Sequence, residues 1–387
     1  MISLRAITLI YIFFLCISYN LEWFYIVGSF SYADLLLPPL LLMTLKNRKI
    51  HFDYVFFSLI GLAIISCTSS LLAASFANLE NISLGYVFRS IYFVGLYLLV
   101  LNSTISTEDI LKAITLSLIF SLFFGLYIWS TSPRYFGFTS MPMLHVLDSP
   151  SGLFVNRNET GLFSSLLFTV SFFALTYKKF FTPRMMSLVL LISFLSAALS
   201  FSKGAWLLSL AGFLFVSVFR FTKRQLIFVS LVPLILIAAT ATGGFEFFDA
   251  VIERFTNSGE TNSYRVTYIF DSLLIGIDNF LLGIGPGNYR EYTINNGFSV
   301  TIDPHNAFTQ SFAELGFFGF VIVIGMYVAS IIKSFRKIRI SDTYVIIFAL
   351  IMLLFMDGLQ SGLSLSIKLT YILFALSSRA IYASQKD

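Results

Sequence analysis

Twelve long apolar stretches, separated mostly by short polar connections, limit this chain more than any other feature of its sequence. Stretches of about 17–25 apolar residues predict helices that cross a membrane, because a helix of that length spans the hydrocarbon core. The composition agrees, since 57% of the residues are hydrophobic and 12% are charged. The sequence therefore predicts an all-α, polytopic membrane bundle that forms a single domain over residues 1–387. The predicted spans are 6–20, 24–45, 53–74, 83–102, 110–131, 159–177, 185–202, 204–220, 225–242, 306–332, 343–360 and 366–384.

Two of these stretches have unusual features. The first follows Arg5 and is similar to the core of a signal peptide, but no small-residue cleavage site follows it, so we interpret it as a retained span. The second contains the pair Pro38-Pro39, which predicts a kink or an irregular stretch inside that span.

The basic residues predict the orientation of the bundle. All but eight of the 25 lysines and arginines fall on one side of the predicted spans, together with both termini. The positive-inside rule assigns that side to the cytoplasm. The eight exceptions lie on the outer face or within reach of it, where the rule disfavours them, so each calls for an explanation. They are Arg89, Arg134, Arg157, Lys203, Arg254, Arg265, Arg290 and Lys368.

Two predicted outer loops are long, at residues 132–158 and 243–305. The larger loop lies between the ninth and tenth spans and contains glycine-rich turns over 283–288. It also contains a predicted amphipathic helix near 263–280, with Arg265 close to its start. Connections of this length usually have a function, because short loops suffice to join neighbouring helices.

His305 is the first candidate for chemistry, at the point where the large loop re-enters the tenth span. An imidazole at this place can accept a proton from a substrate hydroxyl. The structural alternative is a histidine that only caps the helix or lies at the interface. The next residue, Asn306, is more typical of a helix cap or of a side chain that orients the imidazole.

Four groups of residues carry a resemblance to the O-antigen ligase family, which is similar in fold to some polysaccharide polymerases. The first is His305-Asn306 followed, after nine residues, by Gly316-x-x-Gly319. The others are Ser202-Lys203-Gly204-Ala205-Trp206, Arg265 with Ile269 four residues later, and the glycine-rich run from Leu282 to Asn288. The resemblance covers roughly residues 155–360. Two positions depart from the family pattern, since Lys203 stands where arginine is usual and Ile269 where leucine is usual.

The resemblance implies a GT-C-like fold and an inverting glycosyl transfer on the outer face of a bacterial inner membrane. The donor would be a glycan on undecaprenyl diphosphate. The acceptor would be a sugar hydroxyl, on lipid A–core for a ligase or on a growing lipid-linked chain for a polymerase. The motif is common to both, and we favour the ligase because the histidine motif and its spacing fit that family best.

A diphosphate leaving group needs its growing negative charge to be stabilised by a metal ion or by cationic side chains. The outer segments contain no Asp-x-Asp or paired-carboxylate motif, so the sequence predicts a metal-independent enzyme without a cofactor. Arginine suits phosphate oxygens because its planar fork donates two parallel hydrogen bonds. The candidate contacts are Arg265, Arg290, Arg157, Arg89 and Lys203, and for each the alternative is a salt bridge, a buried pair or a snorkelling side chain.

Three supporting residues have structural alternatives as well. Gly316 and Gly319 form a small-x-x-small pair, which favours close helix packing over chemistry. Glu314 is an ionisable group at or near the outer half of a span, where it needs a partner. A functional role and a structural ion pair are equally compatible with its sequence position.

A flippase or transporter for a lipid-linked glycan is the alternative from another functional class. Such a bundle is expected to have repeated halves and charged groups near the middle of the bilayer. We find no internal repeat, and the exceptional charges gather at one face, which favours an enzyme. The net charge of +5 comes from residues dispersed in short loops and does not indicate nucleic-acid binding. The two cysteines, Cys16 and Cys67, fall inside apolar spans and suggest neither a disulfide framework nor a metal cluster.

Overall fold

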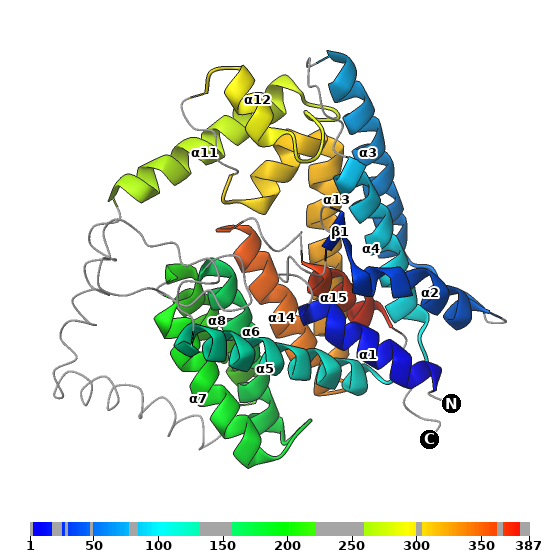
Figure 1. Ribbon diagram of the computed structural model, residues 1–387, viewed down its shortest axis with the longest axis vertical. Helices are drawn as coiled ribbons and strands as arrows, with labels where there is room; N and C mark the ends of the chain where they lie inside the picture. Colours follow the sequence, from blue (N-terminus) through cyan, green and yellow to red (C-terminus); the bar gives the residue numbers. More distant parts are fainter. Residues whose placement is uncertain are drawn as a thin grey trace. The chain divides into compact units, whose positions relative to one another are not determined.

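The computed structural model describes residues 3–17, 25–27, 30–46, 49–76, 84–131, 157–200, 202–220, 259–298, 304–361 and 367–379. Within these ranges every element is helical except one pair of short strands, so the predicted helical class is confirmed for them (Figure 1). The number of spans and the place of the large loop remain predictions. The predicted span 225–242 and most of the predicted loop 132–158 lie outside the described residues.

The chain divides into two units, residues 1–117 with 264–387 and residues 118–263. Helices α5 (Thr107–Thr131) and α11 (Gly259–Asp278) each cross a boundary between them. The remaining elements of the first unit are α1 (Leu4–Ile17), β1 (Tyr25–Val27), β2 (Phe30–Ser31), η2 (Tyr32–Leu36), α2 (Leu37–Leu45), α3 (Tyr54–Phe76), α4 (Leu84–Asn102), α12 (Tyr289–Asn295), α13 (Ala307–Lys337), α14 (Thr343–Gly358) and α15 (Lys368–Ser378).

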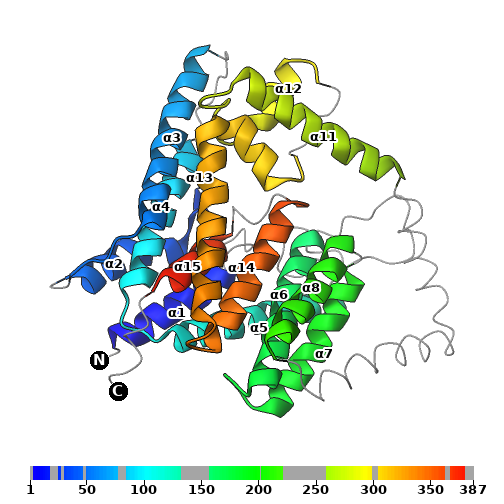
Figure 2. The ribbon, with the colours of Figure 1, turned by 180° about the vertical axis from the view of Figure 1, so that it is seen from behind.

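Helix α13 is the central element of the first unit. It packs against α3, α14 and α15, and α4 in turn packs against α2, α3 and α15 (Figures 1 and 2). Much of the core lies on α14 and α15, whose apolar side chains are mostly buried. By length and composition three helical segments suffice to cross a membrane, namely Tyr54–Leu72, Asn158–Tyr177 and Ala307–Lys337, and six further apolar helices are shorter.

The described residues between 25 and 45 do not form the single helix that hydropathy predicts for 24–45. Strands β1 and β2 pair antiparallel, with Tyr25 opposite Ser31, and the turn of 3-10 helix η2 then leads into the nine-residue helix α2. Pro38 and Pro39 lie in the first turn of α2, where the missing N–H groups leave no helical hydrogen bond unmade. The irregular stretch that the proline pair predicts is therefore present, but it precedes the prolines.

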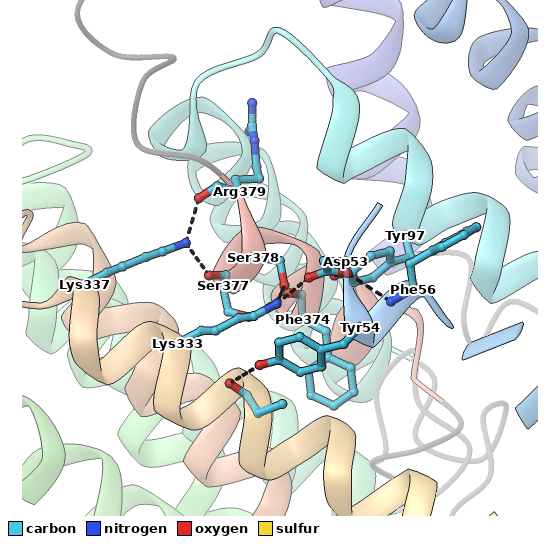
Figure 3. A network of polar contacts seen from close by, with 11 residues as sticks. Asp53, Tyr54, Phe56, Tyr97, Lys333, Lys337, Phe374, Ser377, Ser378 and Arg379 are labelled. Atoms are coloured by element: carbon cyan, nitrogen blue, oxygen red, sulfur yellow. Dashed lines mark hydrogen bonds and ion pairs between the residues drawn. The ribbon is translucent and has the colours of Figure 1, made fainter. Parts of the chain in front are cut away.

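A polar network ties four helices of the first unit together at the C-terminal end of α13 (Figure 3). The Lys333 ammonium group forms an ion pair with Asp53 and donates to Ser378 Oγ at 2.9 Å. Tyr97 Oη donates to Asp53 Oδ1 at 2.8 Å, and Lys337 Nζ donates to the carbonyl of Ser377 at 2.6 Å. The network joins α3, α4, α13 and α15 at the end of α13 that the basic residues predict to be cytoplasmic.

The second unit contains α6 (Arg157–Tyr177), α7 (Pro183–Leu199) and α8 (Lys203–Phe219). Small and hydroxylated side chains line the contacts of α6 with the other two helices. Ser164 Oγ donates to Ser196 Oγ at 2.9 Å, and Ser165 Oγ donates to the Ala205 carbonyl at 2.8 Å. Small residues let backbones approach closely, and the hydroxyls hydrogen-bond across the interface, which is how apolar helices associate within a membrane.

Candidate functional site

A break inside α13 organises the region around the histidine motif. Gly316 has φ 65° and ψ −168°, so the helix is interrupted at this residue. The break leaves the carbonyls of Ala313 and Glu314 without helical partners. The segment from Leu282 to Asn288 is called the glycine-rich loop below. The backbone N–H groups of its residues Ile284 and Gly285 donate to these two carbonyls at 2.9 Å each. The loop therefore supplies the hydrogen-bond donors that these two carbonyls lack within the helix.

Glycine is required on both sides of this contact because the two backbones approach so closely. A Cβ on Gly283 would lie 2.3 Å from the carbonyl carbon of Glu314, and a Cβ on Gly316 would lie 2.5 Å from the backbone of Leu281. Both glycines also have positive φ. The sequence indicated close helix packing for Gly316 and Gly319. In the structure Gly316 packs against a loop instead, and the nearest side chain to Gly319 is Leu315 of its own helix.

His305 precedes the N-cap of α13, and that cap is Asn306. The side-chain oxygen of Asn306 accepts the backbone N–H groups of Phe308 and Thr309, both at 3.0 Å. Its Nδ2 donates to the carbonyl of Leu359, just after α14, at 3.1 Å. Asn306 therefore fixes the start of α13 against the end of α14, and it thereby fixes the backbone beside His305.

The half-buried His305 ring lies against Tyr268 of α11. The two ring centroids are 6.3 Å apart and the rings are inclined at 72°, an edge-to-face arrangement. Arg265 precedes Tyr268 by three residues, so both side chains lie on the same face of α11. The Arg265 side chain is half-buried, and its Nε is buried without a hydrogen-bond partner. Helix α11 covers Gly259–Asp278, where the sequence predicted an amphipathic helix near 263–280.

Arg290 and Arg89 belong to the same unit. Arg290 is exposed on α12, close after the glycine-rich loop. Arg89 is half-buried on α4, with its guanidinium carbon 5.6 Å from the centre of the Phe93 ring. One turn before it, Tyr86 packs so closely on Gly287 that a Cβ there would lie 2.3 Å from the tyrosine ring. The end of α4 that carries Arg89 is thereby held against the glycine-rich loop.

Glu314 is buried, with 7% of its surface exposed, beside the break in α13. Its Oε1 accepts a hydrogen bond from Gln310 Nε2, one turn earlier, at 3.1 Å. Its backbone carbonyl accepts from Gly285 and also from Ser69 Oγ at 3.1 Å. The side chain and the backbone of Glu314 thus both contribute to the junction between α13, α3 and the loop.

Arg157 and Lys203 belong to the second unit, as the first residues of α6 and α8. A Cβ on Gly161, one turn into α6, would lie 2.7 Å from Cβ of Ala205, two residues into α8. The starts of the two helices are therefore adjacent within that unit. The carboxyl group of Glu159, in the first turn of α6, is buried there as well.

Three ionisable residues that belong to none of the sequence motifs lie within apolar helices or beside them, and one of them, Lys368, is among the eight exceptional basic residues. Asp357, near the end of α14, is 3% exposed, and its Oδ2 makes no hydrogen bond. It precedes Leu359, the carbonyl partner of Asn306. Lys368 begins α15 and forms a buried ion pair with Asp34 of η2, at 2.7 and 2.8 Å to the two carboxylate oxygens. The sequence signal that could have identified each of them is a charged residue inside a predicted span.

The described part of the chain contains no group of three or more histidine, cysteine, aspartate or glutamate side chains placed to hold a metal ion.

A family model with the description O-antigen ligase matches residues 187–324 of this chain. The matched segment contains Lys203, Arg265, Arg290 and the histidine motif, whereas Arg89 and Arg157 lie outside it. No curated protein matches the chain.

Proposed function

We propose, from the match of the O-antigen ligase family model to residues 187–324, that this chain is an inverting membrane glycosyltransferase. Its donor is a glycan on undecaprenyl diphosphate, and its acceptor is a sugar hydroxyl. The observation that carries the proposal is the contact of His305 with Tyr268, on the face of the helix that also bears Arg265. This arrangement supports a site at one end of the first unit in which His305 is the base and Arg265 is the phosphate-binding cation.

The transfer is a single displacement at the anomeric carbon of the donor. The acceptor oxygen forms a bond to that carbon, the bond from carbon to the phosphate oxygen breaks, and undecaprenyl diphosphate leaves with the electron pair. His305 removes the proton of the attacking hydroxyl, a role that contributes about 10²–10⁴-fold to a rate in general. Attack on the face opposite the leaving group inverts the configuration.

The diphosphate gains negative charge as it leaves, and cationic side chains stabilise it. Arg265 is the first candidate, because a buried Nε without a partner leaves an N–H group ready for a phosphate oxygen. Arg290 and Arg89 are further candidates in the same unit. Arg290 lies on α12, close after the glycine-rich loop, and Arg89 lies one turn after Tyr86, which packs on Gly287 of that loop. Arg157 and Lys203, in the second unit, remain candidates on the strength of the sequence.

Four residues support this site. Asn306 caps α13 beside the base, and Glu314 and Gly316 belong to the break that holds the glycine-rich loop. Gly319 follows the break by three residues. We add Asp357, whose carboxyl oxygen has no hydrogen-bond partner two residues before the carbonyl that Asn306 binds. We place the site at the periplasmic face of the inner membrane, with both termini in the cytoplasm.

We propose lipid A–core as the acceptor, with a repeat-unit polymerase as the alternative within the family. The test is a reconstitution of the full chain in liposomes with the lipid-linked donor and either lipid A–core or a second lipid-linked glycan. A ligase transfers the glycan to lipid A–core, and the product shifts on a gel. Transfer only to the second lipid-linked glycan would instead identify a polymerase.

Histidine substitutions test the enzyme itself. We expect His305→Gln to lower transfer about 10²-fold or more, because glutamine is not a base at neutral pH. His51→Gln is the matched control, since His51 is exposed and lies beside Asn102 at the other end of α4. Equal transfer by His305→Gln and the wild type would remove His305 from the chemistry.

A flippase is the candidate from another class, and the buried pair of Asp34 and Lys368 is the observation that favours it, because transporters carry charged pairs inside the membrane. The same liposomes decide between the two functions when movement of the lipid carrier is followed beside glycan transfer. Loss of carrier movement in His305→Ala, with transfer intact, would support a flippase. We expect the opposite result. We also expect a chelator of divalent ions to leave transfer unchanged, and strict dependence on such an ion would contradict stabilisation by arginines alone.

A further inference from the structure

We propose that Tyr268 is a positioning residue that fixes the plane of the His305 imidazole, a role that rests on the proposed function of His305 as the base. The two rings meet edge to face at 6.3 Å and 72°. The second side-chain torsion of histidine has broad, roughly two-fold preferences, so rotamer preference alone does not fix the direction of the ring nitrogens. A neighbouring ring that packs against the imidazole restricts this torsion.

Tyr268 is itself held firmly. Its ring is buried, with 7% of the residue exposed. Its backbone carbonyl accepts a hydrogen bond from Ser272 Oγ at 2.6 Å and lies 3.5 Å from Tyr289 Oη, which is fully buried. Ser272 Oγ and Tyr289 Oη are 3.3 Å apart. The Tyr289 hydroxyl thus links this turn of α11 to the start of α12.

The anchor extends to the break in α13. Tyr289 packs in an apolar cluster with Ile275 of α11, Ile284 of the glycine-rich loop and Ala313 of α13. Ile284 and Ala313 are also joined by a backbone hydrogen bond of 2.9 Å. The element that carries Tyr268 is therefore fixed to the helix that follows His305. Because the Tyr268 ring comes from this fixed frame, it gives the imidazole a constant orientation.

The same helix carries Arg265 one turn earlier, so α11 sets the positions of both the proposed base and a proposed phosphate contact. Such geometry matters for rate, because a misplacement of about 1 Å costs roughly 10²-fold in a reaction that depends on orientation. Tyr268 acts on the base through packing of its ring and takes no part in the chemistry. The hydroxyl group of Tyr268 is not needed for this role.

The test measures the imidazole directly as well as glycan transfer. His51→Gln and His145→Gln together leave His305 as the single histidine of the chain. Ring-labelled histidine in the reconstituted full chain then gives one set of NMR signals, which are followed as the pH is changed. Tyr268→Leu removes the aromatic ring, Tyr268→Phe keeps it, and Ser272→Ala removes the hydrogen bond to the Tyr268 carbonyl. Phe270→Leu is the matched control, because Phe270 is an aromatic residue of the same helix that is 61% exposed.

We expect Tyr268→Leu to shift the His305 signals and to lower kcat about 10- to 100-fold, with KM for the donor nearly unchanged. The acid limb of the pH–rate profile should move with the titration of the His305 signals. Tyr268→Phe should restore the wild-type values, Ser272→Ala should give a smaller shift in the same direction, and Phe270→Leu should have no effect. Ser272→Ala keeps the measurement available if Tyr268→Leu does not fold.

Unchanged His305 signals in Tyr268→Leu would overturn the proposal. If that variant does not fold, unchanged signals in Ser272→Ala would overturn it. A Tyr268→Phe protein that behaves like Tyr268→Leu would do the same. The proposed function fails separately. If the His305 signals depend on Tyr268 while His305→Gln still transfers glycan, positioning stands and the base does not.

Discussion

The backbone N–H of Gly285 donates to the carbonyl of Glu314 at 2.9 Å, and this bond joins the glycine-rich loop to the helix that follows the histidine motif. It exists only because α13 is interrupted at Gly316, which frees the Glu314 carbonyl. The Glu314 carbonyl accepts the Gly285 N–H and Ser69 Oγ in place of a helical bond. The break is therefore part of the site, because it determines where the loop and α11 are held.

Gly316→Ala should destabilise the protein strongly. The backbone angles of Gly316, φ 65° and ψ −168°, lie in a region that is essentially restricted to glycine, so another residue there costs about 1–3 kcal/mol. The added Cβ would also lie 2.5 Å from the backbone of Leu281. The thermal unfolding midpoint of the purified protein measures the loss. Gly325→Ala is the matched control in the same helix, since its Cβ meets nothing within 4 Å and alanine favours a helix by about 1 kcal/mol. A Gly316→Ala protein that melts with the wild type would show that the break is not needed.

Arg265→Ala should lower glycan transfer about 10²-fold or more with normal membrane insertion, because a preorganised contact strengthens as charge develops on the leaving group. Arg265→Lys should recover only part of the activity, since lysine offers a point charge in place of a planar fork. Initial rates over a range of donor concentrations separate kcat from KM. The control is Arg336→Ala, an exposed arginine at the other end of α13. Wild-type turnover in Arg265→Ala would exclude a role for this residue.

Local patterns predicted some of these elements well. The periodic apolar residues placed a helix near 263–280, and the structure has α11 at Gly259–Asp278. The amide side chain of Asn306 before an apolar run identified the start of α13, because asparagine accepts the free N–H groups of a first turn. Such signals depend on neighbouring residues, so the sequence alone contains them.

Other features depend on partners that are distant in the sequence. The break at Gly316 is stabilised by Ile284 and Gly285, about thirty residues earlier, and no periodicity encodes that pairing. Hydropathy also treated residues 24–45 as one helix, because the apolar residues of strands β1 and β2, of η2 and of α2 give the same average as a span. The proline pair indicated that the stretch is irregular but did not show what form it takes.

The ion pair of Asp34 and Lys368 provides a test of stability. Lys368→Met should destabilise the first unit by about 3–5 kcal/mol, because it leaves the Asp34 carboxylate buried without its partner. Asp34→Leu together with Lys368→Met should recover most of the loss, since no buried charge then remains. Unfolding in detergent with a chemical denaturant measures both variants. The pair of exposed Arg5 and half-buried Asp109 is the control, and Arg5→Met should change stability by about 0–1 kcal/mol. Equal losses of stability in Lys368→Met and Arg5→Met would contradict the role of burial.

Asp271, on α11 within the predicted outer loop, should make stability depend on pH. Burial raises the pKa of its carboxyl group above the ordinary value. The folded state therefore holds the proton more tightly than the unfolded state. The contribution of Asp271 to stability is fully present below the ordinary pKa of the carboxyl group and is lost as the pH rises through the raised pKa of the folded state. Asp271→Asn removes the charge, so it should raise the melting temperature at pH 8.

At pH 3 the Asp271 carboxyl group is mostly protonated in both the folded and the unfolded state. Asp271→Asn and the wild type should therefore melt at nearly the same temperature, and the acid measurement is an internal control. Scanning fluorimetry at several pH values between these limits follows the difference, which should grow as the pH passes through the titration of Asp271. A variant that melts below the wild type at pH 8 would show that the Asp271 carboxylate is stabilising instead. That result would point to an attractive interaction between this carboxylate and a cation.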